Sequence, residues 1–260
     1  MTLLSRLVPV LLLLPLAACG GAPDGVRPLS AAASTLNDNT LKLARATLAN
    51  GDVASARDLY AQAEKRDPGN LEAQMGVGDC DLLLGDGEKA RLEYAASAKR
   101  FPKALEPLLA LGRVDLTQRH IKDGEAHYRQ GRALAPLDPR PLLGLGAADD
   151  LQGRHEEAQA YYRMALAMKP DDMGARNDLG LSLALSGHPR QAINVLLDIA
   201  GAANAPPQAR QNLALAYGLD GNAAAAESIL EAEHANRTVV QNDLDYYRFL
   251  RSRMPAGGGS

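Results

Sequence analysis

The sequence predicts an all-α protein, a solenoid of about six helical hairpins closed by one capping helix. Four prolines, Pro68, Pro102, Pro136 and Pro170, follow one another at intervals of 34 residues. Glycines, tyrosines and leucines recur with the same step. Self-similarity with a period of roughly 20 to 50 residues is typical of proteins made of stacked repeats. The composition agrees, because alanine and leucine are abundant and aromatic residues make up only 4% of the chain.

Each recurring position has a physical role in a helical hairpin. A small residue in the first helix lets a neighbouring helix approach, and a glycine with positive φ forms the turn between the two helices. A large side chain in the second helix fills the gap between repeats, and the proline ends that helix. The small residues are Ala44, Gly78, Gly112, Gly146, Gly180 and Ala214. The turn position holds Gly51, Gly85, Arg119, Gly153, Gly187 and Gly221, and the large position holds Tyr60, Tyr94, Tyr128, Tyr162, Leu196 and Leu230.

This pattern resembles the tetratricopeptide repeat, which implies a right-handed superhelical solenoid. Six copies cover 37–240, at 37–70, 71–104, 105–138, 139–172, 173–206 and 207–240. In the fifth copy the proline position holds Asn204, so we expect a looser junction there. No hairpin buries its apolar face alone, so stacking of neighbours is expected to supply the stability.

Residues 1–18 are predicted to be a bacterial lipoprotein signal peptide that is not part of the fold. Arg6 precedes an apolar run that is too short to span a membrane. The run ends in Leu16-Ala17-Ala18-Cys19, which resembles the site at which a cysteine receives its lipid and becomes the first residue. Gly20 rather than Asp follows Cys19, which favours the outer membrane over the inner membrane. The alternative is an ordinary secretory signal that contains a cysteine by chance.

Separate predictions concern the two ends of the array. Residues 19–36 begin with the lipidated Cys19 and are rich in glycine, alanine and proline, so we expect a flexible tether. Residues 241–254 are expected to form the capping helix that covers the last repeat. A capping box at 238–241 is predicted to start this helix. The tail, 255–260, is expected to be disordered.

One face of the first helices is predicted to bind a protein partner. In this repeat class that face lines a concave groove, and here it is rich in leucine. The expected groove residues are Leu41, Met75, Leu82, Leu109, Arg113, Leu116, Leu143, Leu181 and Leu215, with Leu48, Leu185 and Leu219 on the same face. An apolar groove accepts an amphipathic helix or an extended apolar peptide, and nearby charges can set its register. The alternative is that these leucines are simply core between repeats.

An unusual column of aspartates runs through the array. Asp81, Asp115 and Asp149 occupy a position where tyrosine is usual for this repeat. Equivalent helices in adjacent repeats lie about 10 Å apart, whereas ligands of one metal ion lie within about 2.5 Å of it. We therefore expect a solvated or arginine-paired ladder rather than a metal site. Cys80 lies in a column of small residues and is expected to be a small buried hydrophobe, not a redox thiol.

No motif predicts an enzyme, a cofactor or a metal. His155-Glu156-Glu157 lacks the second histidine of a zinc-protease helix. Gly76-Val77-Gly78 follows no strand, so it is not a nucleotide-binding loop. The formal net charge of −3 gives no global attraction to nucleic acid. The expected partner is therefore another protein.

The complete pattern resembles one family more narrowly. A lipoprotein signal, a short linker, the repeat array, the segment 209–221 and the closing segment 242–251 together look like the TadD family. These are the repeat lipoproteins of the tight-adherence (Flp pilus) assembly system. The resemblance implies a periplasm-facing outer-membrane lipoprotein that acts as a pilotin-like scaffold on a secretin during pilus assembly. The alternative is an adaptor of another envelope process, such as outer-membrane protein assembly or recruitment of a peptidoglycan enzyme.

Overall fold

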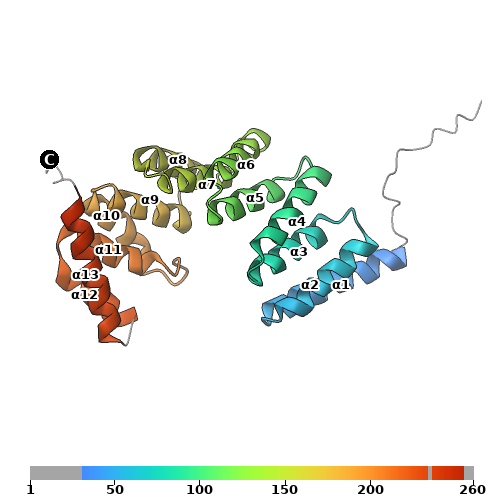
Figure 1. Cartoon of the computed structure of the whole chain (residues 1–260), viewed down its shortest axis with the longest axis horizontal. Helices are drawn as coiled ribbons and strands as arrows, with labels where there is room; N and C mark the ends of the chain where they lie inside the picture. Colours follow the sequence, from blue (N-terminus) through green and yellow to red (C-terminus); the bar gives the residue numbers. More distant parts are fainter. Residues whose placement is uncertain (1–30, 234–235, 255–260) are drawn as a thin grey trace, which may run out of the picture.

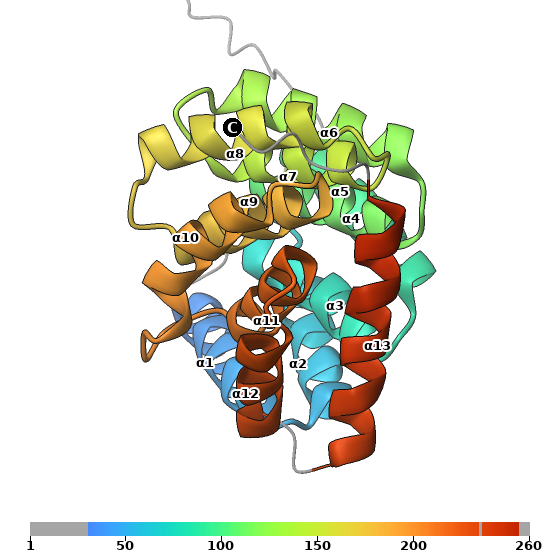
Figure 2. The same ribbon diagram turned by 90° about the vertical axis from the view of Figure 1, so that its left-hand side faces the viewer.

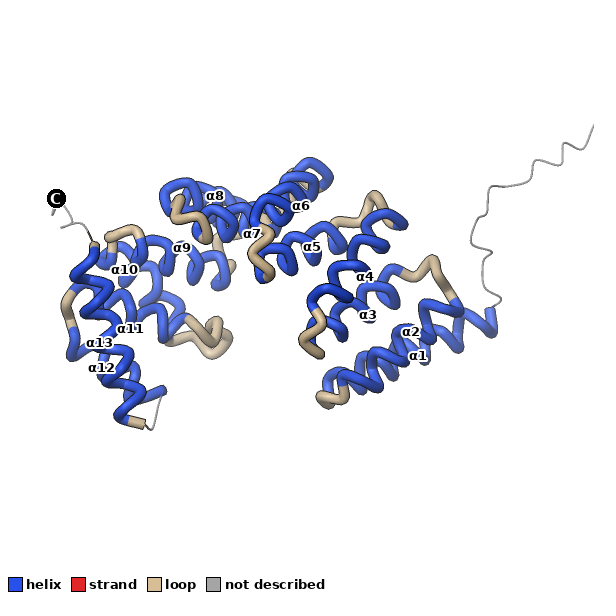
Figure 3. The backbone as a smooth tube through the Cα atoms, viewed as in Figure 1, coloured by secondary structure: helices blue, strands red, loops and turns tan. Residues whose placement is uncertain are grey.

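The computed structural model describes residues 31–233 and 236–254, and the regular elements in this part of the chain are all α-helices (Figure 3). The thirteen helices found there are α1 (Ala31–Ala49), α2 (Val53–Arg66), α3 (Leu71–Leu83), α4 (Gly87–Arg100), α5 (Glu106–Thr117), α6 (Ile121–Leu134), α7 (Arg140–Asp150), α8 (His155–Met168), α9 (Met173–Leu185), α10 (Pro189–Ala200), α11 (Ala209–Asp220), α12 (Ala223–Glu233) and α13 (Arg237–Arg253). The expected all-α architecture is confirmed.

Consecutive helices pack as hairpins that stack on one another. α1 pairs with α2, α3 with α4, and so on to α11 with α12, while α13 packs against α11 and α12. The stack curves into an arch (Figure 1). The first helices α5, α7, α9 and α11 also contact one another in sequence, so they lie on the inner side of the arch. The predicted array of six hairpins with a capping helix is therefore confirmed.

Each hairpin turn contains one residue with positive φ. Glycine holds that position in five of the turns in the described residues, and Arg119 holds it in the third hairpin with φ 65°. Left-handed backbone costs a residue with a Cβ roughly 1 kcal/mol. The 34-residue step in the sequence therefore marks a backbone conformation, and Arg119 adopts it despite the cost.

Neighbouring hairpins interlock through tyrosines that lie against glycines. Tyr128 on α6 is 7% exposed and lies between Gly112 on α5 and Gly144 on α7. A Cβ at Gly112 would lie 2.6 Å from the tyrosine ring, and one at Gly144 would lie closer still. The same arrangement places Tyr60 on α2 against Gly76 on α3. A side chain at either glycine would push the ring away and separate the hairpins.

The aspartate column is buried between hairpins and paired with arginine. Asp81, Asp115 and Asp149 are 3%, 0% and 4% exposed. Arg57 on α2 donates to Asp81 on α3, and Arg91 on α4 donates from Nε to Oδ1 of Asp115 on α5 at 2.6 Å. The expected ladder is thus arginine-paired, but it is not solvated, because all three carboxylates are buried and those of Asp81 and Asp115 face an arginine of the preceding hairpin.

Asp149, the third aspartate of the column, pairs with an arginine from a different position. The position equivalent to Arg57 and Arg91 holds Glu125, which cannot donate to a carboxylate. Asp149 instead accepts from Nε of Arg154 at 3.0 Å, and Arg154 also lies 3.7 Å from Glu125. Arg154 therefore restores the balance of charge between the third and fourth hairpins.

Both ends of the array differ from the expected boundaries. α1 begins at Ala31, inside the segment expected to be a tether up to residue 36, because a run of alanines favours helix. α13 begins at Arg237, since the side chain of Asn236 accepts from the backbone N–H of Thr238. The capping box expected at 238–241 is therefore wrong. The predicted signal peptide, the lipidation site Cys19 and the tail 255–260 lie outside the described residues.

Cys80 is fully buried in the core between α1, α2 and α3. Burial raises the pKa of its thiol, which keeps the sulfur protonated and unreactive. The prediction that Cys80 is a small buried hydrophobe is confirmed.

Replacing Arg91 with methionine is expected to destabilise the chain by roughly 3 kcal/mol, because the buried Asp115 carboxylate would lose its arginine. The double variant Arg91→Met/Asp115→Leu is expected to recover most of that loss, because no charge is then left buried. Urea unfolding of both variants measures the free energies.

The matched control is Arg129→Met, which removes an exposed arginine paired with Glu125 and is expected to cost less than about 1 kcal/mol. If Arg91→Met were as stable as Arg91→Met/Asp115→Leu, the claim that the buried Asp115 carboxylate needs its arginine would be contradicted.

Candidate partner-binding surface

The candidate surface consists of the solvent-accessible side chains on α1, α3, α5, α7, α9 and α11, and we call it the first-helix surface. Of these, α5, α7, α9 and α11 lie on the inner side of the arch (Figure 1), and α1 and α3 are the equivalent helices of the first two hairpins. Because the hairpins stack in register, residues 34 apart in the sequence occupy equivalent places on successive helices. A column in the sequence therefore becomes a row of side chains along the inner side.

Two of the expected groove residues are not available to a partner. Leu41 is 3% exposed and lies in the buried cluster that contains Tyr60. Leu116 is 7% exposed and lies in the cluster that contains Tyr128. Their assignment to a groove is corrected, because these two side chains point into the core between helices.

The remaining apolar residues of the predicted groove are half-buried. They are Met75, Leu82, Leu109, Leu143, Leu181 and Leu215. Five of them, all except Leu181, pack against buried clusters that contain Tyr94, Tyr128 or Tyr162. These side chains serve the core on one side and reach solvent on the other. The ninth predicted residue, Arg113, is exposed.

Apart from Leu36 and Leu43 on α1, which are 53% and 55% exposed, three exposed leucines lie where first helices end. Leu83 at the end of α3 is 63% exposed, Leu185 at the end of α9 is 38% exposed, and Leu151 at the C-cap of α7 is 40% exposed. We call these three residues the leucine row. Leu185 was among the residues expected on this face, whereas Leu83 and Leu151 were not. The 34-residue step back from Leu185 was the signal that could have found them.

Ion pairs join neighbouring first helices on the same surface. Arg45 on α1 lies 2.8 Å from Glu72 on α3, and Arg140 on α7 lies 3.5 Å from Glu106 on α5. Such exposed pairs add little stability. Glu72, Glu106 and Arg140 lie in the first turns of α3, α5 and α7, whereas Leu83 and Leu151 lie at the opposite ends of α3 and α7.

Arg113 belongs to a third pair of this kind. It lies 3.7 Å from Asp79, and the hydroxyl of Tyr94 donates to the same carboxylate at 2.6 Å. Burial raises the pKa of Tyr94, so its hydroxyl stays protonated and can donate. Arg113 is therefore positioned by the second and third hairpins together.

A second polar cluster lies at the junction of α7, α8 and α9. Asp150 accepts from the Tyr162 hydroxyl at 2.9 Å and from the Ser182 hydroxyl at 2.7 Å, and its carboxylate meets Nδ1 of His155 at 2.7 Å. Among the described residues, no cation forms an ion pair with nearby Asp178. Burial raises the pKa of Asp178 to about 6, and the Asp150 carboxylate adds to that effect.

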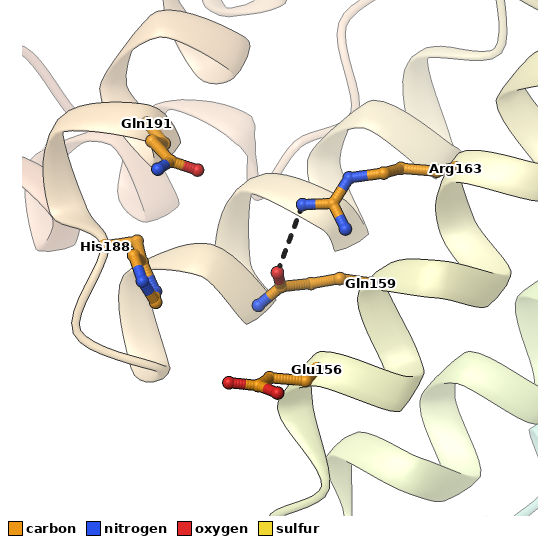
Figure 4. A pocket seen from close by; sticks show the side chains of 5 residues that line it. All are labelled: Glu156, Gln159, Arg163, His188 and Gln191. Atoms are coloured by element: carbon orange, nitrogen blue, oxygen red, sulfur yellow. Dashed lines mark hydrogen bonds between the residues drawn. The ribbon is translucent and has the colours of Figure 1, made fainter.

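A shallow polar pocket of about 280 Å³ lies between second helices instead (Figure 4). Its lining residues are Glu156, Gln159, Arg163, His188 and Gln191. Gln159 accepts from Arg163 at 3.2 Å and donates to Ser186 at 2.9 Å. Ser186 also donates to the carbonyl of Leu183 and lies 3.1 Å from Nδ1 of His188, so its hydroxyl is held at the C-cap of α9.

The described residues contain neither a cluster of metal-ligating side chains nor a helix that could span a membrane. Within 31–233 and 236–254, no group of three or more histidine, cysteine, aspartate or glutamate side chains is placed to hold a metal ion. In the same ranges, no helix combines the length and apolar character needed to cross a membrane.

Comparison with known proteins agrees with the repeat architecture. The family model described as tetratricopeptide repeat matches residues 41–104 and 109–173. Among curated proteins, none matches the chain by sequence.

Solved structures share the fold at low sequence identity. The Cut9–Hcn1 complex of the APC/C contains a chain with TM-score 0.71 and 19% identity, matched over 82% of this chain and 43% of that one. The present chain thus spans less than half of that relative. PilF of Pseudomonas aeruginosa matches with TM-score 0.66 and 14% identity over 83% of this chain and 99% of its own. A repeat protein of Parabacteroides merdae matches with TM-score 0.65 and 16% identity over 81% and 84%.

The substitution Asp178→Asn is expected to stabilise the protein above pH 6. The folded chain holds the Asp178 proton with a pKa of about 6, against an ordinary value of 3.8. The contribution of the protonated Asp178 side chain to folding stability is fully present below about pH 4 and is lost as pH rises through about 6. At pH 7.5 the variant should gain about 1 to 2 kcal/mol, and near pH 4 it should gain nothing.

Urea unfolding at the two pH values measures the difference, with the exposed Asp171→Asn as control. A gain in stability that is the same at both pH values would contradict the assignment of the shift to Asp178.

Proposed function

Because the chain is a tetratricopeptide-repeat protein, we propose that it is a lipid-anchored scaffold that captures a protein partner on its first-helix surface. The proposed partner is a segment of a secretin, and the process is assembly of the Flp pilus by a protein of the TadD family. The observation that carries the proposal is the leucine row, in which Leu83, Leu151 and Leu185 share one position of the 34-residue repeat in the second, fourth and fifth hairpins, with Thr117 at that position in the third.

A protein ligand fits this surface better than a small molecule does. Stacked repeats present an extended concave face to a partner, and scaffolds of this family are typically non-enzymatic. Leucines in a row along several hairpins can contact successive apolar side chains of an extended or helical segment. The pair of Arg113 with Asp79, which lies one helical turn before Leu83, would disfavour a segment in the wrong register.

Contact with the leucine row alone would give only weak binding of a partner. Covering three leucines that are 38% to 63% exposed contributes roughly 2 to 4 kcal/mol. A micromolar complex requires about 8 kcal/mol. A lipid anchor would supply part of the difference by confining the scaffold beside a membrane-bound partner, since tethering raises the effective concentration to the millimolar range.

Three features support the envelope setting of the proposal. The sequence Leu16-Ala17-Ala18-Cys19 resembles a lipoprotein cleavage site, and Gly20 after it favours the outer membrane. The segments 209–221 and 242–251 resemble the TadD family. PilF, a pilus-assembly lipoprotein, has the same fold at low identity.

Affinity purification from envelopes of the host tests the proposal, with mass spectrometry of the proteins that are recovered. We expect a secretin to be recovered with the wild-type protein. The triple variant Leu83→Glu/Leu151→Glu/Leu185→Glu should reduce its recovery at least tenfold, because three charges would replace the apolar row.

The matched control is Leu92→Glu/Leu197→Glu, which charges exposed leucines of α4 and α10 on second helices and should leave recovery unchanged. Equal recovery with a folded triple variant would reject the leucine row as the binding site. Recovery of a barrel-insertion complex or a cell-wall hydrolase in place of a secretin would reject the pilus assignment.

A further inference from the structure

The capping helix α13 exposes two aromatic rings on the side that faces away from α11 and α12. One face buries Val240, Leu244 and Tyr247 against α11 and α12. On the other side, Tyr246 is 56% exposed and Phe249 is 53% exposed. Figure 2 shows α13 at the edge of the molecule, with its outer side free. The outer face that ends a solenoid is usually polar, so exposed aromatic rings at this position indicate a contact surface.

A ridge of three residues crosses this outer face. Asp245, Phe249 and Arg253 follow one another at four-residue intervals, so their side chains lie on one side of the helix. All three are exposed. The Arg253 guanidinium lies 5.1 Å from the centroid of the Phe249 ring, and Asp245 accepts from Arg248. The ridge therefore consists of an acid, an aromatic ring and a base, with Asp245 four residues before Phe249 and Arg253 four residues after it.

We propose that this ridge binds a second copy of the same chain, with the two α13 helices antiparallel about a two-fold axis at Phe249. Such an axis places Phe249 against Phe249 of the second copy. It also places each Asp245 opposite Arg253 of the other chain, and the symmetry makes this pair twice. A two-fold interface requires a patch that is complementary to itself, and an acid and a base at equal sequence separations from an aromatic residue meet that requirement.

The second copy is a better occupant than an unrelated apolar partner. A general apolar contact would explain Phe249 and Tyr246 but not the symmetric charges beside them. The contact involves one helix from each chain and is small, so the dimer should be weak, of the order of micromolar or weaker. The dimer would present two first-helix surfaces to one partner, but the inference does not depend on the proposed function.

Two charge variants separate this arrangement from other contacts. In Arg253→Asp, both ends of the ridge are acidic, and in Asp245→Arg both are basic. Each variant alone would place like charges opposite one another across the axis. An equimolar mixture would again place acid opposite base at both sites, as a heterodimer.

Sedimentation equilibrium of the chain with Cys19→Ser, which keeps it unlipidated, measures the association. The chain with the wild-type ridge should form a dimer in a concentration-dependent way. Each charge variant alone should have a dimer dissociation constant at least tenfold higher. The mixture should return to within about threefold of the wild-type association. Arg132→Asp, which changes an exposed arginine on α6, is the matched control and should dimerise as the wild-type ridge does.

Far-UV circular dichroism identifies any variant that fails to fold. In that case the neutral variants Arg253→Gln and Asp245→Asn replace the charge reversals, and they should weaken the dimer less. A wild-type ridge that stays monomeric at every concentration would overturn the proposal. So would charge variants that dimerise unchanged, or a mixture that associates no better than its components.

Discussion

The contact between a tyrosine of one hairpin and a glycine of the next is the constraint on which the rest of the structure depends. Tyr128 fits between Gly112 and Gly144 because neither glycine has a Cβ, so three successive helices approach within van der Waals distance of one ring. Since a solenoid has contacts only between neighbouring repeats, each such contact holds the whole array together. The same contact joins the first and second hairpins, where Tyr60 lies against Gly76, and such close packing of neighbours contributes to the arch that carries the leucine row.

The buried pairs of arginine and aspartate fix the register in which neighbouring hairpins pack. Aromatic and small apolar side chains tolerate small shifts, whereas a buried carboxylate must meet its arginine in one geometry. Asp81 and Asp115 are held by arginines from the preceding hairpin, and Asp149 is held by Arg154 because Glu125 occupies the usual arginine position. The three pairs lie in the first four hairpins, the part of the chain whose first helices carry Leu83 and Leu151.

The 34-residue period made the fold predictable because each column has a single backbone or packing role. The positive φ of Arg119 and the burial of Cys80 follow from position alone. The binding surface was harder to predict, because an apolar residue on a first helix serves either the core or the groove. Leu41 and Leu116 turned inward, while Leu83 and Leu151 reached solvent, and a change of one residue in helical phase decides between these outcomes. The burial of the aspartates was equally hard to predict, because Asp81 and Asp115 depend on arginines of the preceding hairpin and Asp149 depends on an arginine beyond the turn of its own hairpin.

The central claim is that the partner covers the inner side of the arch, and oxidative footprinting of side chains tests it most directly. The captured complex and the free chain would be labelled with hydroxyl radicals, and the labelled residues identified by mass spectrometry. The account predicts that Leu83, Leu151 and Leu185 lose reactivity in the complex, while Leu92, Met164 and Leu197 on the second helices keep theirs. Protection of the second-helix residues with an unprotected leucine row would contradict it.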